Sequence, residues 1–94
     1  MKILPKYLKK NGFELIQMFR HGNVALYRKR KPDQESEHFE VIRVQSHKGY
    51  TVQGVKIPPS EHFPSDEQWG THGWTFMTGC EAAQKYHSLL DEDS

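Results

Sequence analysis

The hydrophobic and polar positions of the chain predict strands over most of its length and a helix near its end. Strand-forming residues set between turn residues mark five segments: 13–20, 24–31, 39–46, 50–57 and 74–77. Gly22-Asn23 supplies positive-φ residues for a hairpin between the first two segments. Gly54 interrupts the fourth segment, where a bulge is expected. These short segments fit an antiparallel meander of four to five strands.

The clearest local signal is Thr78-Gly79-Cys80-Glu81, which has the pattern of a capping box. The Thr78 hydroxyl is expected to accept from the backbone N–H of Glu81, whose carboxylate reaches back, so a helix begins here. An apolar stripe with helical spacing follows: Ala82, Ala83, Tyr86, Leu89 and Leu90. Because one face of the sheet is the available apolar surface, the stripe predicts an α+β fold with this C-terminal helix packed on that face.

The first residues carry a weaker helical signal. Leu4, Tyr7 and Leu8 are spaced to share one face of a short helix, and Pro5 suits its first turn. Asn11-Gly12 supplies the stop. A short N-terminal helix is therefore predicted.

Residues 58–73 are the irregular part of the chain, because prolines and glycines interrupt any regular pattern. Ser65-Asp66-Glu67-Gln68 matches a capping box and predicts one helical turn. Phe63 and Trp69 supply large apolar side chains, so this long connection is expected to fold onto the core. We expect Trp74 to be buried in the core and Trp69 to be partly covered by its loop.

Length and composition narrow the class of protein. A chain of 94 residues, 35% of them hydrophobic, has room for one small core and predicts a single domain over 1–94. Cys80 is the only cysteine, so no disulfide within the chain is expected and the predicted compartment is the reducing cytosol. No apolar run has the length of a signal peptide or a membrane span, so no membrane partner is expected.

Charge is distributed unevenly along the chain. Residues 1–31 hold nine Lys and Arg against the single acid Glu14, a net charge of +8. Residues 32–94 hold four basic and eleven acidic residues, a net charge of −7. This split indicates either internal pairing between the halves or two surfaces with different partners.

The strongest cationic run is Arg28-Lys29-Arg30-Lys31, which with Lys9 and Lys10 suits contacts with several phosphates. In a strand, however, successive side chains of this run point to opposite faces. The acidic residues that follow would then lie opposite the run: Asp33, Glu35, Glu37 and Glu40. We favour cross-strand ion pairs, in particular of Arg28, Arg30 and Lys31 with Glu35, Glu37 and Glu40, over phosphate binding.

No pattern in the chain indicates catalysis, a metal or a cofactor. The six histidines and Cys80 lack the close spacing of zinc ligands, so neither a metal site nor a cofactor is predicted. Cys80 near a helix N-terminus, with His72 or His87 as a base, would suit a thiol enzyme. We favour the interpretation that Cys80 is a small buried hydrophobe beside Ala83.

Four aromatic residues lie close together in the sequence: Phe63, Trp69, Trp74 and Phe76. Such a group suits a ligand pocket or a protein-binding hot spot, although a domain of this size also needs aromatic residues for its core. Phe63 and Trp69 are the predicted protein-binding residues.

The run Ser60-Glu-His-Phe-Pro-Ser-Asp-Glu-Gln-Trp-Gly70, followed by Gly73-Trp-Thr-Phe and a capped helix with Ala-Ala, resembles small proteins of unknown function encoded by bacteriophages and mobile elements. The resemblance covers the last two-fifths of the chain and implies a short accessory protein of a bacterial cell. It carries no site residues.

Taken together, these features predict a non-enzymatic cytosolic module that binds another protein, with a homodimer through an exposed strand edge as one form of that interaction. The alternative is a nucleic-acid-binding accessory protein. Its predicted binding residues are Lys9, Lys10, Arg28, Lys29, Arg30 and Lys31. A small hydrolase or thiol enzyme is the third choice.

Overall fold

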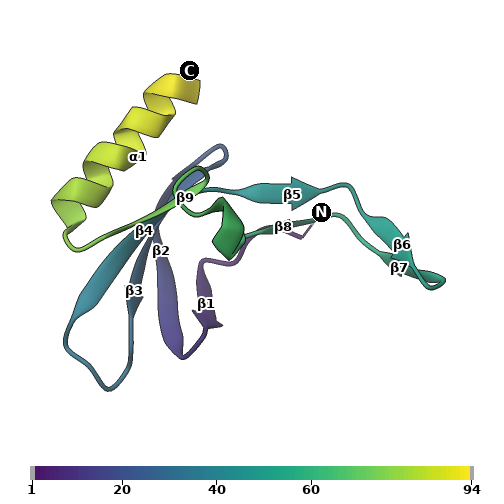
Figure 1. The fold of residues 1–94 in the computed structure, drawn as a ribbon, viewed down its shortest axis with the longest axis horizontal. Coiled ribbons are helices and arrows are strands. Elements are labelled where there is room, and N and C mark those ends of the chain that lie inside the picture. Colours follow the sequence, from purple (N-terminus) through teal and green to yellow (C-terminus); the bar gives the residue numbers. More distant parts are fainter. Residues whose placement is uncertain (1, 94) are drawn as a thin grey trace.

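A five-stranded antiparallel sheet with a helix on one face forms the body of the protein in the computed structural model, which describes residues 2–93 (Figure 1). The strands, in their order across the sheet, are β1 (Tyr7–Lys10), β2 (Phe13–His21), β3 (Val24–Arg30), β4 (Glu37–Arg43) and β9 (Gly73–Phe76). Helix α1 (Gly79–Asp93) follows β9 and packs against β3, β4 and β9. The predicted α+β class, antiparallel sheet and C-terminal helix are confirmed.

The hairpin of β2 and β3 is the longest pairing in the sheet. Its turn lies at Gly22-Asn23, as the sequence predicted, although of the two residues only Gly22 has a positive φ, +59°. The register shifts between Gln17 and Phe19, so one extra residue of β2 bulges from the ladder. The bulge turns Phe19 toward α1, where its ring lies 6.1 Å from the ring of Tyr86.

The prediction of a short N-terminal helix is wrong, because residues 7–10 form strand β1 instead. Asn11 and Gly12 both have positive φ, 54° and 82°, which is the requirement of a tight two-residue hairpin turn. The turn folds β1 back onto β2, with Tyr7 opposite Ile16. A helix of two turns is marginal in isolation, whereas pairing gives these residues the hydrogen bonds of a sheet ladder.

The expected fourth strand at residues 50–57 is also wrong, because this segment is a hairpin. Strand β6 (Tyr50–Val52) pairs with β7 (Val55–Ile57), and Gln53 and Gly54 form the turn with φ values of 49° and 80°. Strands β5 (Gln45–His47) and β8 (Ser60–His62) pair with each other between the sheet and this hairpin. Residues 45–62 thus form a two-stranded arm that extends away from the sheet (Figure 1).

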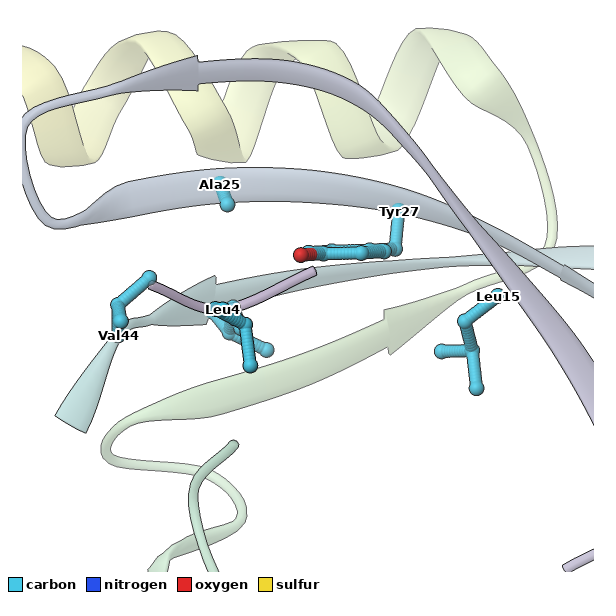
Figure 2. Close-up of a cluster of buried hydrophobic side chains, with 6 residues drawn as sticks. Leu4, Leu15, Ala25, Tyr27 and Val44 are labelled. Carbon is cyan, nitrogen blue, oxygen red and sulfur yellow. The ribbon is translucent and has the colours of Figure 1, made fainter. Parts of the chain in front are cut away.

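Apolar side chains are buried on both faces of the sheet. The core toward α1 consists of Val24, Leu26, Val41, Ala82, Tyr86 and Leu89. The core on the opposite face consists of Leu4, Leu15, Ala25, Tyr27, Ile42 and Val44, and Figure 2 shows Ala25 and Tyr27 pointing away from α1. The Tyr27 hydroxyl donates to the carbonyl oxygen of Pro5 at 2.8 Å, so the N-terminal segment is held over this second core.

The start of α1 matches its prediction closely. The backbone N–H of Glu81 donates to Thr78 Oγ1 at 3.2 Å, and the Thr78 hydroxyl donates to Glu81 Oε1 at 3.0 Å. Of the predicted stripe, Ala82, Tyr86 and Leu89 are buried. Trp74 was expected to be buried in the core and is half-buried: it packs against the core toward α1, and Lys85 Nζ lies 4.1 Å from the centre of its ring.

Leu89→Ala is expected to lower the free energy of unfolding by about 2–4 kcal/mol, because the Leu89 side chain is fully buried between α1 and the sheet. Ser88→Ala, at the neighbouring exposed position, should change it by less than about 0.5 kcal/mol. Chemical denaturation of both variants measures the difference. Equal stabilities of the two variants would contradict the packing of α1.

Candidate functional sites

A partly buried ion pair helps to fix the base of the arm to the sheet. Arg20 Nη1 and Nη2 donate to the two carboxylate oxygens of Glu61, both at 2.7 Å. Glu61 Oε1 also accepts from the backbone N–H of Leu4 at 2.9 Å. The hydrogen bond from Arg20, with the one from Leu4, lowers the pKa of Glu61 from 4.5 to about 2. The carboxylate is therefore ionised at neutral pH, and it joins β2, β8 and the N-terminal segment.

The outer part of the arm has one apolar face and one polar face. The register pairs Tyr50 with Ile57 and Val52 with Val55, and strand alternation places these four side chains on one face. Three of them are open to solvent: Tyr50 is 54% exposed, Val52 49% and Val55 61%. No helix or further strand of the described chain lies over this part of the arm (Figure 1).

The charge of the outer part of the arm has one sign. Between residues 45 and 60 there are two lysines, Lys48 and Lys56, and no acidic residue. Sequence reasoning did not single out the arm, because strand formers around a central Gly54 suit a bulged strand as well as a hairpin. The signal that could have found it is Gln53-Gly54 between Val52 and Val55, a two-residue turn set between β-branched residues.

A pocket of about 340 Å³ lies on the face of the sheet opposite α1, beside the β1–β2 turn. Phe13, Leu15 and Trp69 give it apolar walls. Its polar lining consists of Lys10, Asn11, Lys29, Glu40, Asp66 and Thr75. Strands β1 to β4, β9 and the 3₁₀ turn Asp66–Gln68 all contribute, so residues far apart in sequence meet here.

Glu40 is the most buried polar group of the pocket, with 5% of its surface exposed. Its Oε2 accepts from Lys29 Nζ at 3.2 Å and from the Thr75 hydroxyl at 3.4 Å. Thr75 Oγ1 in turn accepts from the indole Nε1 of Trp69 at 3.1 Å. This chain of contacts fixes the carboxylate in the floor of the pocket and orients the Trp69 ring.

Gly73 makes room for the Trp69 ring. A Cβ atom on Gly73 would lie 2.4 Å from Trp69 Cζ3, closer than any real contact of this kind. Only glycine therefore lets the indole lie against β9 and reach Thr75.

The six cations predicted to bind nucleic acid gather at the end of the sheet that holds the β1–β2 turn, on two faces. Strand alternation places Lys10 and Lys29 on the pocket face and Arg28 and Arg30 on the α1 face. Arg28 lies 3.7 Å from Glu37 and Lys29 lies 3.2 Å from Glu40. Within residues 2–93, four of the six form no ion pair: Lys9, Lys10, Arg30 and Lys31. Of the three residues expected to pair with Glu35, Glu37 and Glu40, only Arg28 does so among the described residues, and the other ion pair of the run is made by Lys29.

The predicted protein-binding residues, Phe63 and Trp69, both lie against the core opposite α1. The Phe63 ring is 5.0 Å from the ring of Tyr27, and Trp69 lines the pocket. Both are half-buried, as expected for residues that fold the loop onto the core. Their role in protein binding stays a prediction.

Cys80 is exposed, which contradicts the expectation of a small buried hydrophobe. It lies in the first turn of α1, where the sheet is faced by Ala82 and not by Cys80. Among residues 2–93 there is no group of three or more His, Cys, Asp or Glu side chains placed to hold a metal ion.

No protein-family model, curated protein or solved structure matched the chain. Over the described residues, no helix has the length and apolar character required to cross a membrane.

Glu61→Gln should lower the free energy of unfolding at pH 7, because it removes a carboxylate held by Arg20 and Leu4. A lowered folded-state pKa gives stability that is complete above pH 4.5 and is lost as the pH falls toward 2. The stability difference between the wild type and this variant should therefore shrink over that range. Glu67→Gln, at an exposed position, is the control. Denaturant titrations from pH 7 to pH 2 measure it, and a difference that does not change with pH would contradict the role of Glu61.

Proposed function

We propose that this protein is a non-catalytic binding module that holds a protein partner through the apolar face of its arm. The observation that carries the proposal is the ribbon of β6 and β7, whose residues Tyr50, Val52 and Val55 lie open on one face. An isolated two-stranded hairpin is marginally stable in water unless it packs against something. A partner surface over this face would supply that packing.

The character of this face favours a protein over a nucleic acid. Full burial of a valine or another large apolar side chain contributes roughly 1.5–3 kcal/mol, so three side chains that are about half exposed would gain roughly half of that each. A phosphate backbone offers no apolar surface for this gain, and its recognition rests on cations. An apolar patch on a protein does offer it.

The charge next to the apolar face comes from Lys48. Lys56 lies opposite Thr51 on the polar face of the ribbon, whereas Lys48 precedes Tyr50 by two residues, and residues 45–60 contain no acid. An acidic side chain at the edge of the partner's apolar patch would complement Lys48. A second copy of this chain, the homodimer expected from the sequence, is one form of such a partner. Measurement of the oligomeric state separates this form from a different protein.

Val52→Ser combined with Val55→Ser should weaken partner binding by about tenfold or more, because it removes apolar contact from the centre of the face. Thr51→Ala, on the other face of the ribbon, is the matched control and should bind as the wild type does. Quantitative affinity capture from the native cell compares the three proteins, and sedimentation velocity tests self-association. Both variants should retain wild-type stability, because none of the three positions lies in the core.

A captured protein that is retained equally by the wild type, the double variant and the Thr51→Ala control would contradict this role of the arm. Loss of binding in the control alone would move the contact to the polar face and contradict it as well.

A second candidate function, nucleic-acid binding, is favoured by the four cations at the β1–β2 turn and the end of β3 that have no carboxylate partner among residues 2–93. Lys10→Gln, Arg30→Gln and Lys31→Gln together should flatten the slope of log affinity against log salt by roughly two to three units, because each phosphate contact contributes about 0.9. Lys48→Gln with Lys56→Gln is the control for charge removal elsewhere. Salt titrations on single-stranded and duplex DNA and on RNA measure the slope. An unchanged slope, or no binding at low salt, would rule out this candidate.

A further inference from the structure

We infer that the pocket opposite α1 binds a nucleotide whose base carries an exocyclic amino group. This site is separate from the arm, and the inference does not depend on the proposed protein partner. It rests on four observations about the pocket: a carboxylate oxygen that is open to the pocket, the charge already placed beside it, the apolar walls, and a lining cation that forms no ion pair with any described residue.

The first observation is the free oxygen of Glu40. Both hydrogen bonds to the Glu40 carboxylate end on Oε2, and within residues 2–93 Oε1 accepts none. The residue is 5% exposed and lines the pocket. Among the described residues, Arg28 Nε is the one buried side-chain polar atom without a hydrogen-bond partner, so Glu40 Oε1 is within reach of solvent. The pocket therefore presents an acceptor to which a ligand donor can bind in place of water.

The second observation is the charge beside this acceptor. Lys29 Nζ lies 3.2 Å from Glu40 and 4.4 Å from the centre of the Phe13 ring, so the carboxylate already has its counter-charge. A ligand ammonium at Oε1 would stand close to the Lys29 ammonium and be repelled. A neutral N–H donor satisfies the oxygen without that cost. The exocyclic amine of adenine, cytosine or guanine is such a donor.

The third observation is the shape and character of the walls. Phe13, Leu15 and Trp69 are apolar, and the Trp69 ring is held by Gly73 and Thr75. Ordered aromatic side chains of this kind suit a flat ring system, because bases stack on aromatic surfaces. A volume of about 340 Å³ lies at the lower end of the range of small-molecule sites, which fits one nucleotide.

The fourth observation is the cation at the mouth. Lys10 lines the pocket, forms no ion pair with any described residue, and lies 5.5 Å from the centre of the Phe63 ring. Lys31, 4.9 Å from the centre of the Phe13 ring, is likewise unpaired. Asp66 is the one acid of the lining besides Glu40, so the phosphate belongs on the side of Lys10. Amine, flat ring and phosphate together define a nucleotide.

The test uses the full chain and titrates it with adenosine 5′-monophosphate and with purine riboside 5′-monophosphate, which lacks only the amino group. We expect the amino compound to bind about tenfold more tightly, as the value of one hydrogen bond to a charged acceptor implies. Isothermal titration gives the affinities, and amide chemical shifts should move at Phe13, Glu40 and Trp69. This comparison needs no variant, so it stays decisive even if substitution of Glu40 unfolds the protein.

Two variants place the contacts. Glu40→Gln should narrow the difference in affinity between the two nucleotides. Lys10→Gln should weaken the binding of adenosine monophosphate without affecting the binding of adenosine. Lys85→Gln, on α1, is the control and should bind as the wild type does. A short oligo-dA that binds more tightly than the mononucleotide identifies the natural source as single-stranded nucleic acid, and equal binding identifies the free nucleotide. Equal affinity for the two monophosphates, absence of binding at millimolar concentration, or shifts confined to another face would overturn the inference.

Discussion

Burial of strand β3 on both faces is the constraint on which the rest of the structure depends. Residues 24–27 are all buried, with Val24 and Leu26 under α1 and Ala25 and Tyr27 under the N-terminal segment and the loop that carries Phe63. A strand in a sheet this small can be covered twice only if two segments far apart in sequence close over it. Helix α1 closes one face. The other is closed by short pieces of irregular chain, and the pocket lies where that cover ends, with Lys29 following directly along the same face.

Local signals in the sequence predicted those elements whose stability is itself local. The capped start of α1 and the Gly22-Asn23 hairpin both depend on residues within a few positions of one another, and both are present. The predictions for the N-terminal segment and for residues 50–57 were wrong for a shared reason. Their structure depends on turns at Asn11 and Gln53, which take positive φ although neither is glycine, and a non-glycine residue gives only a weak signal of that conformation.

The sequence singled out some of the residues that line the pocket, but it did not show that they form one site. Lys10, Lys29 and Trp69 were each singled out from the sequence, whereas Glu40 was seen only as a partner for the basic run. Their meeting depends on register: β3 and β4 pair Tyr27 with Glu40, so Lys29 lies diagonally across from that carboxylate and not opposite it. A shift of one residue would turn Glu40 toward α1 and abolish the site. Sequence patterns of single strands do not contain this long-range register.

The arm and the pocket occupy opposite ends of β2 and are joined by one short connection. Arg20 holds Glu61 at the base of the arm, while Phe13 lines the pocket at the other end of the strand. The chain passes from β8 to Trp69 through Phe63, whose ring packs on Tyr27, and through Pro64, which is fully buried. The chain between the arm and Trp69 is therefore fixed to the core at two points. The contacts proposed for the arm and for the pocket thus lie on separate parts of one small core, each anchored to it by its own residues.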